Sequence, residues 1–285
     1  MRQRRNKPEA AREQVQLCII QARGKQTLGA LTYSTDYREH LMPQHFDEEF
    51  EHVRSQVLTM GGLVESQLQG AIEAMIAGDV AGARVIERND HKVNAMEVEI
   101  DEECTRLLSH RQHEASELRL VMSVIKTISD LERIGDESER VAKMAKFMAG
   151  DRLHEHVMGE FEHMGQLVRT MLGNVLDAFA RTSVDQAVAV VAADDKVDAK
   201  YESITRQLMT YMAEDPRSIP AVLNILWAAR ALERIGDRSQ NIAEYIVYLV
   251  KGKDVRHTTF ENVQAAAQQD TPIDDLDVSG GGGSV

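Results

Sequence analysis

The sequence is poor in proline, cysteine and aromatic residues, and each shortage excludes a class of protein. Five prolines and an aromatic content of 5 % in 285 residues exclude a β-sandwich or β-barrel, because such folds need frequent turns and many aromatic or β-branched residues. Two cysteines without a C-x-x-C spacing exclude a disulfide framework and indicate a reducing compartment. We therefore expect a cytoplasmic protein.

Long apolar runs and positive charge are also scarce. The basic N-terminus is followed by an apolar stretch of only four residues, 17–20, whereas a secretory signal needs about 7 to 15 and a membrane span about 20. We expect neither of these segments. The formal net charge of −13 disfavours nucleic acids and anionic lipid surfaces, because phosphates and carboxylates repel each other. From charge alone, partners should be basic, cationic or neutral.

Helix-forming residues are what the sequence has in quantity. Ala, Leu, Glu, Gln, Met and Arg are abundant, and apolar residues recur at spacings of three and four, a pattern typical of amphipathic helices. We predict an all-α protein with six long helices. Their approximate ranges are 44–77, 80–112, 117–149, 155–181, 184–214 and 217–250.

An internal repeat organises these helices. The motif Leu-Glu-Arg-Ile-Gly-Asp at 131–136 recurs at 232–237, and Asp-x-Lys-Val-Asn at 90–94 recurs as Asp-x-Lys-Val-Asp at 194–198. Anchors in the same order with slightly different offsets indicate two copies of one three-helix unit. The fold class is therefore all-α, with two tandem three-helix bundles.

The two ends differ from the repeats in composition. Residues 1–39 hold eight Lys or Arg and four acidic residues without a sustained apolar period, and 279–284 is a Gly/Ser run; both are typical of chain that does not pack. The predicted domains are a disordered extension at 1–39, a first repeat at 40–150, a second repeat at 151–252 and a flexible tail at 253–285.

Acidic side chains in the repeated motifs form candidate metal sites. Residues four apart lie on one face of a helix, so oxygen-bearing side chains of the second and third helices of each repeat can converge on one patch. Carboxylate clusters of this kind suit magnesium, manganese, calcium or iron better than a tetrahedral structural zinc. The candidate ligands are Asp90, Glu132 and Asp136 in the first repeat, and Asp194, Asp198, Glu233 and Asp237 in the second.

Two considerations bear on these clusters. Asn94 stands where the second repeat has Asp198, so the second patch is the better metal candidate. The competing interpretation is a solvated acidic stripe without a metal, since charge runs on helices are usually solvated. In that interpretation the neutralising arginines are Arg133, Arg140, Arg234 and Arg238.

A different metal chemistry is the alternative function. Glu49-x-x-His52 and Glu160-x-x-His163 reproduce the Glu-x-x-His pair that di-iron bundle proteins use twice, which would make the chain a ferritin-like metal-binding or oxidase protein. Their position near the starts of helices in separate repeats argues against a shared site.

Several segments closely resemble the PhoU family of phosphate-transport accessory proteins. They are 57–65, the two Glu-Arg-Ile-Gly-Asp motifs, 177–181 and 206–212. The resemblance covers about residues 40 to 257, and the doubled motif is specific to this family. It implies tandem three-helix bundles in a protein that is not an enzyme, is often a homodimer and is peripheral to the membrane through its partners.

The resemblance also implies partners and ligands. Family members hold down the phosphate-starvation response by contacting the phosphate-sensor histidine kinase and the ATPase subunit of the phosphate permease. Their acidic motifs match Glu132/Asp136, Glu233/Asp237 and Asp194/Asp198 here, and Asp90/Asn94 imperfectly. In some members these motifs bind multinuclear clusters of iron, zinc, manganese or magnesium.

Overall fold

The computed structural model describes residues 42–109, 113–148 and 155–269, with side chains from 48 and, after the second gap, from 157. The compact unit of the chain begins at Phe46, within the helix Met42–Ala77. The predicted disordered extension at 1–39 and the Gly/Ser run at 279–284 lie outside the described residues.

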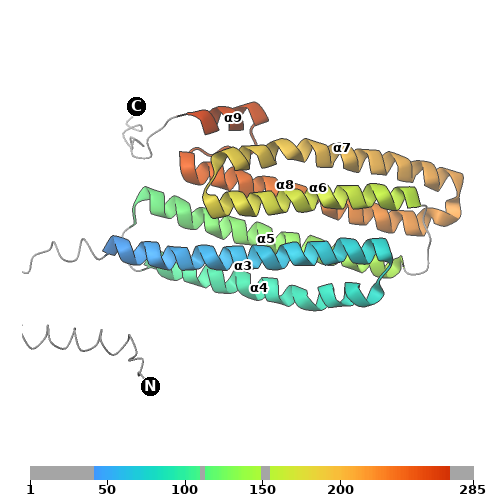
Figure 1. Cartoon of the computed structure of the whole chain (residues 1–285), viewed down its shortest axis with the longest axis horizontal. Coiled ribbons are helices and arrows are strands. Elements are labelled where there is room, and N and C mark those ends of the chain that lie inside the picture. The colour runs from blue at the N-terminus through green and yellow to red at the C-terminus, as the bar shows by residue number, and fades with distance from the viewer. Residues whose placement is uncertain (1–41, 110–112, 149–154, 270–285) are drawn as a thin grey trace, which may run out of the picture. The chain divides into compact units, whose positions relative to one another are not determined.

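Six long helices dominate the described chain, and no strand occurs in it, which confirms the predicted all-α class (Figure 1). The bounds are α3 Met42–Ala77, α4 Val80–Ser109, α5 Ala115–Phe147, α6 Glu155–Arg181, α7 Val184–Glu214 and α8 Ile219–Lys251. Two short elements, η1 Pro216–Ser218 and α9 Phe260–Gln268, complete the described structure.

Local sequence explains where the helices end. Gly78 takes a left-handed φ of 63° after α3, a conformation that glycine adopts without steric cost. Ser183 caps α7 by accepting a hydrogen bond from the backbone N–H of Gln186, as its capping position predicts. Asp215 with Pro216 opens the 3₁₀ turn η1 rather than α8 itself, which begins at Ile219.

The helices form the two predicted bundles, α3–α4–α5 and α6–α7–α8, which pack against each other. The α5 and α8 helices make extensive contacts with each other, and α4 packs on α5 while α7 packs on α8. In the first bundle α3 lies against α4, where Gly70 faces Ile86, and it meets the second bundle where Gly61 faces Leu176 of α6. Both bundles therefore share one apolar core.

The segment predicted as a flexible tail is partly structured, which corrects that prediction. After Gly252 the chain turns and forms α9, which packs on α7 and α8 and buries Val263 and Ala266. Val255 in the connecting loop is also buried. Burial of these apolar side chains is what orders a segment whose composition suggests a mobile linker.

In the described part of the chain, no helix combines the length and the apolarity needed to cross a bilayer.

Candidate metal site

The duplicated motif positions its acids by helical periodicity. In α5, Leu131 and Ile134 are fully buried, and Leu232 and Ile235 match them in α8. The glutamate after each leucine and the aspartate after each glycine therefore lie at the edge of the core, on the side where α4 or α7 packs.

The second cluster, defined as Asp194, Asp198, Glu233 and Asp237, brings carboxylates from two helices together. One oxygen each from Asp198 of α7 and from Glu233 and Asp237 of α8 lie within 4.8 Å of one another. Glu233 is buried, whereas the other two are exposed. Three oxygen ligands at this spacing, with one side open to solvent, suit a hard divalent cation.

Asp194, the fourth member of this cluster, packs against the motif glycine, which makes room for it. A Cβ on Gly236 would lie 3.1 Å from the Asp194 Oδ1 atom, so any larger residue in the motif would press on the carboxylate. Asp194 is buried, and its Oδ1 atom has no hydrogen-bond partner. The buried Oε2 atom of Glu233 has none either. Two buried, unpartnered oxygens are costly, and a cation bound at this cluster would offset the negative charge of both carboxylates.

Burial and crowding raise the pKa of every carboxyl in the second cluster. Burial, followed by the charges of Asp198 and Asp237, raises the pKa of Asp194 to about 7. Burial is also the first cause of the raised pKa of Glu233, with Asp237 next. For Asp237 burial comes first and Asp198 second. Without a cation these groups resist ionisation together, whereas a bound cation would favour the ionised form of each.

One arginine compensates part of this charge. Arg230, three residues before Glu233 on α8, donates a hydrogen bond to the Glu233 carboxylate and stacks on the Tyr201 ring, 5.6 Å from its centroid. Arg230 is not among the residues predicted from the sequence, although its i, i+3 spacing from Glu233 is a detectable signal. The guanidinium leaves the Oε2 atom of Glu233 without a partner, so it does not complete the site.

The first cluster, defined as Asp90, Asn94, Glu132 and Asp136, is looser. Asn94 donates a hydrogen bond of 3.4 Å to the Oδ2 atom of Asp90, whose buried Oδ1 atom has no partner. Burial first, then Asp136, raises the pKa of both Asp90 and Glu132. Among the described residues, the second cluster contains the only three acidic, His or Cys side chains with ligand atoms within 4.8 Å of one another.

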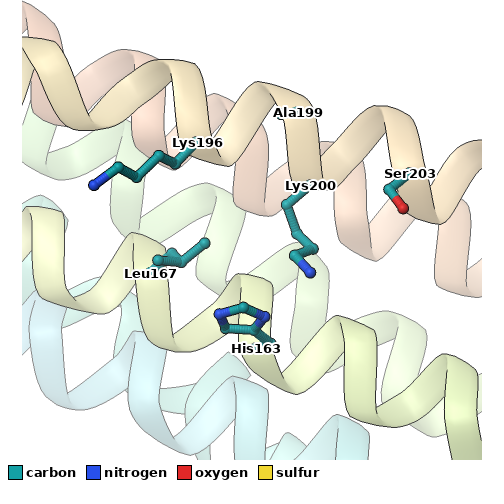
Figure 2. Close-up of a pocket in the computed structure, with 6 residues that line it drawn as sticks. All are labelled: His163, Leu167, Lys196, Ala199, Lys200 and Ser203. Carbon is teal, nitrogen blue, oxygen red and sulfur yellow. The ribbon is translucent and has the colours of Figure 1, made fainter.

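The two Glu-x-x-His pairs have different surroundings. The Nε2 atom of His52 is 3.8 Å from Glu103 of α4. His163 instead lines a hollow of about 420 Å³ between α6 and α7, together with Lys196 and Lys200 (Figure 2). Lys200 donates a 2.9 Å hydrogen bond to Glu160. A glutamate that binds iron needs its carboxylate for the metal, whereas here an ammonium group pairs with it. The geometry therefore does not favour the di-iron alternative.

Comparison with known proteins identifies relatives over most of the chain. The family model described as PhoU domain matches twice, at 57–145 and 161–246. The phosphate-specific transport system accessory protein PhoU of Edwardsiella tarda is 48 % identical over 232 residues, covering 81 % of this chain and 94 % of that protein. The protein of the same name from Escherichia coli K12 is 50 % identical over 226 residues, covering 79 % and 92 %.

Solved structures agree with this result. The crystal structure of PhoU from Pseudomonas aeruginosa superposes with a TM-score of 0.71 at 48 % identity, covering 73 % of this chain and all of the other. The phosphate transport system regulatory protein PhoU from Streptococcus pneumoniae superposes with a TM-score of 0.69 at 31 % identity, covering 74 % and 99 %.

Proposed function

This chain belongs to the PhoU family, and we propose from this premise that it regulates phosphate uptake and the phosphate-starvation response. It acts in the cytoplasm as the accessory protein of a phosphate-specific transport system. It represses the starvation response when phosphate is plentiful by binding the phosphate-sensor histidine kinase, and it adjusts uptake by binding the permease ATPase. The observation that carries this proposal is the family match over both repeats.

The proposed mode of action is binding rather than catalysis. The relatives are named accessory or regulatory proteins. A binding protein shifts its partner between two conformations by as much as its affinities for them differ. In this mechanism the chain binds the phosphatase-competent state of the kinase more tightly than the kinase-competent state. The homodimer implied by the family resemblance is part of this proposal, and sedimentation equilibrium tests it.

We also propose that the second cluster binds a divalent cation. Asp194, Asp198, Glu233 and Asp237 would hold it, because they supply two buried oxygens without partners and three oxygens within 4.8 Å. An all-carboxylate set favours magnesium, manganese or iron over zinc. The cation would supply positive charge that offsets the mutual repulsion of these acids. The first cluster would bind more weakly, because Asn94 replaces a carboxylate.

The regulatory role is tested in cells. Secreted alkaline phosphatase is measured as a starvation reporter in phosphate-rich medium, first in cells that lack this gene and then in cells complemented with it. We expect high output in the deletion strain and low output after complementation. Low output in the deletion strain would contradict the proposed role.

A further inference from the structure

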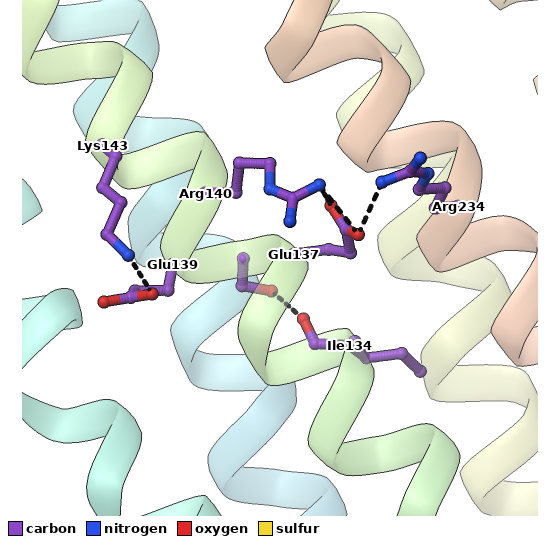
Figure 3. Close-up of polar contacts among 7 residues, drawn as sticks. Ile134, Glu137, Glu139, Arg140, Lys143 and Arg234 are labelled. Atoms are coloured by element: carbon purple, nitrogen blue, oxygen red, sulfur yellow. Dashed lines mark hydrogen bonds and ion pairs between the residues drawn. The ribbon is translucent and has the colours of Figure 1, made fainter.

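The arginine of the duplicated motif pairs with carboxylates outside both clusters, although its charge also counteracts the burial that raises the pKa of Glu132 in the first copy and of Glu233 and Asp237 in the second. Arg133 and Arg234 occupy the same position in the two motif copies, one residue after the glutamate, and therefore lie on a different side of their helices. Arg234 of α8 donates a 3.1 Å hydrogen bond to Glu137 of α5, which also pairs with Arg140 at 3.2 Å (Figure 3). The motif arginine thus lies at the boundary between the two repeats.

A second buried acid at this boundary has the same environment. Asp130 of α5 is 3.4 Å from Arg238 and 4.0 Å from Arg133, and it accepts a 2.9 Å hydrogen bond from the Tyr245 hydroxyl. Four arginines therefore share two carboxylates along the α5–α8 boundary.

The two carboxylates lie deeper in the protein than the four arginines that pair with them. The Glu137 and Asp130 side chains are only 12 % and 3 % exposed, whereas the arginine side chains are 34 to 57 % exposed. The surface that solvent meets is therefore cationic, although the chain as a whole carries −13. We call it the arginine face, defined by Arg133, Arg140, Arg234 and Arg238.

Two exposed aromatic side chains extend this face at one end. Trp227 lies seven residues before Arg234 on α8, and Phe147 lies seven residues after Arg140 on α5, a spacing that keeps each on the same side of its helix. Their exposed fractions are 55 % and 65 %. The α5 and α8 helices run antiparallel, since Glu137 meets Arg234 and the earlier Asp130 meets the later Tyr245. Both aromatic residues therefore lie toward the same end.

We propose that the arginine face and its aromatic end are the surface that binds an acidic segment of a partner protein. The planar guanidinium of arginine can donate two parallel hydrogen bonds to one carboxylate. Tryptophan and arginine are also among the residues most enriched at the hot spots of protein interfaces. The inference rests on the proposed function, because it names the surface through which the kinase or the permease ATPase is bound.

Charge favours an acidic segment at this surface over a second copy of the chain or an anionic membrane. A second copy of the chain docked through the same face would place arginines against arginines, and like charges across an interface are unfavourable. An extended anionic membrane would be repelled by the total charge of −13. A short acidic segment interacts mainly with charges within about 8 Å at physiological ionic strength, so the four arginines act on a segment seated over them more strongly than the distant acids of the chain do.

The test measures binding of the full chain to the cytoplasmic part of the kinase and to the permease ATPase. The test variants are Arg133→Gln/Arg140→Gln and Trp227→Ala. The matched control is Arg169→Gln/Arg206→Gln, which removes the same charge from exposed arginines of α6 and α7. We expect both test variants to weaken binding by about tenfold and the control to bind as the unchanged chain does. The loss in Arg133→Gln/Arg140→Gln should be larger at low salt than at high salt, whereas the loss in Trp227→Ala should depend little on salt.

Trp227 supplies a second readout that needs no substitution. It is the single tryptophan of the chain and is exposed, so binding of the ATPase or the kinase at this face should change its fluorescence, with tryptophan-free versions of those proteins used as probes. Fluorescence that stays unchanged while binding occurs would overturn the inference, as would full binding by both Arg133→Gln/Arg140→Gln and Trp227→Ala.

Three further outcomes identify the other possibilities. Failure of the unchanged chain to bind either protein would overturn the proposed function and this inference together. Arginine-dependent binding to vesicles of equal parts phosphatidylcholine and phosphatidylglycerol, without binding to the proteins, would assign the face to membranes and overturn the inference. Conversion of a dimer to a monomer by the arginine-face variants would make it a self-interface, with the same consequence.

Discussion

Asp194 shows how a single residue can link stability, pH and cation binding. Its pKa is raised from 3.8 to about 7 by burial and by neighbouring carboxylates. As the pH rises from about 4 toward 7, the unfolded chain ionises first. The folded state therefore loses stability across this window, unless a cation compensates the charge.

Asp194→Asn should remove this loss. In EDTA we expect the variant to be more stable than the unchanged chain at pH 8 by about 2 kcal/mol and no more stable at pH 4, as measured by urea unfolding at both values. Asp177→Asn, an exposed aspartate of α6, is the control and should show no such difference. An advantage for Asp194→Asn that is the same at both pH values would contradict the assigned cause.

Removing a ligand carboxylate should weaken cation binding. We expect Asp237→Ala to reduce Mn²⁺ affinity by at least about tenfold, because it removes one of the three clustered oxygens. Isothermal titration at pH 8 measures the affinity, and Asp136→Ala in the looser first cluster should have a smaller effect. Equal affinity in Asp237→Ala and the unchanged chain would show that the second cluster is not the binding site.

At this scale the sequence predicts some contacts and misses others. The i, i+4 spacing is enough to place Glu233 beside Asp237, because both lie on one helix. Nothing in the spacing shows that Arg234 pairs with Glu137, 97 positions away. That contact depends on how α8 packs against α5, which single-sequence periodicity does not specify.

The packing of α7 against α8 depends on the motif glycine. A Cβ at Gly236 would lie 3.1 Å from the Asp194 carboxylate and 3.3 Å from Val197, whereas a Cβ at Gly135 has slightly more room, 3.3 Å from Asp90 and 3.4 Å from Val93. Substitution of the glycine in each copy of the motif can therefore be compared, because the two positions differ in the space around them.

Gly236→Ala should destabilise the protein by about 1 to 2 kcal/mol, even though alanine favours helix by about 1 kcal/mol. Gly135→Ala should cost less. Gly62→Ala, in open space on α3, should be neutral or stabilising and serves as the control. Urea unfolding measures all three, and stabilisation by Gly236→Ala would show that the helices separate without cost at this position.

Helix positions could be predicted closely from the sequence, since each long helix carries a clear amphipathic period. The exception is α9, whose nine residues are too few to establish a period and precede a Gly/Ser run. Its order comes from packing against α7 and α8, a tertiary effect that local sequence does not reveal.

For the whole molecule, the Asp130–Tyr245 hydrogen bond joins the two repeats across α5 and α8. Tyr245→Phe should cost about 1 kcal/mol, and Asp130→Ala about 3 kcal/mol, because the latter leaves Arg238 and the Tyr245 hydroxyl without their buried acceptor. A double-mutant cycle by urea unfolding measures their coupling. Additive effects would show that the bond does not contribute to holding the repeats together.

Net charge does not describe how charge is distributed over the surface. The chain carries −13, yet folding buries Asp130 and leaves the Glu137 side chain only 12 % exposed, whereas the arginines above them are more exposed. A sum over the sequence weights every charge equally, whereas a partner meets only those that reach the surface.

The antiparallel pairing of α5 with α8 has the arrangement of a two-fold dimer within one chain. In a dimer of identical repeats, every contact across the axis would have to occur twice. Here Glu137 faces Arg234, whereas its counterpart 101 positions later is Arg238, which faces Asp130 instead. The two repeats, being parts of one chain, are therefore not bound by symmetry. Each repeat carries its own residues on its side of the boundary, which two identical copies of one repeat could not do.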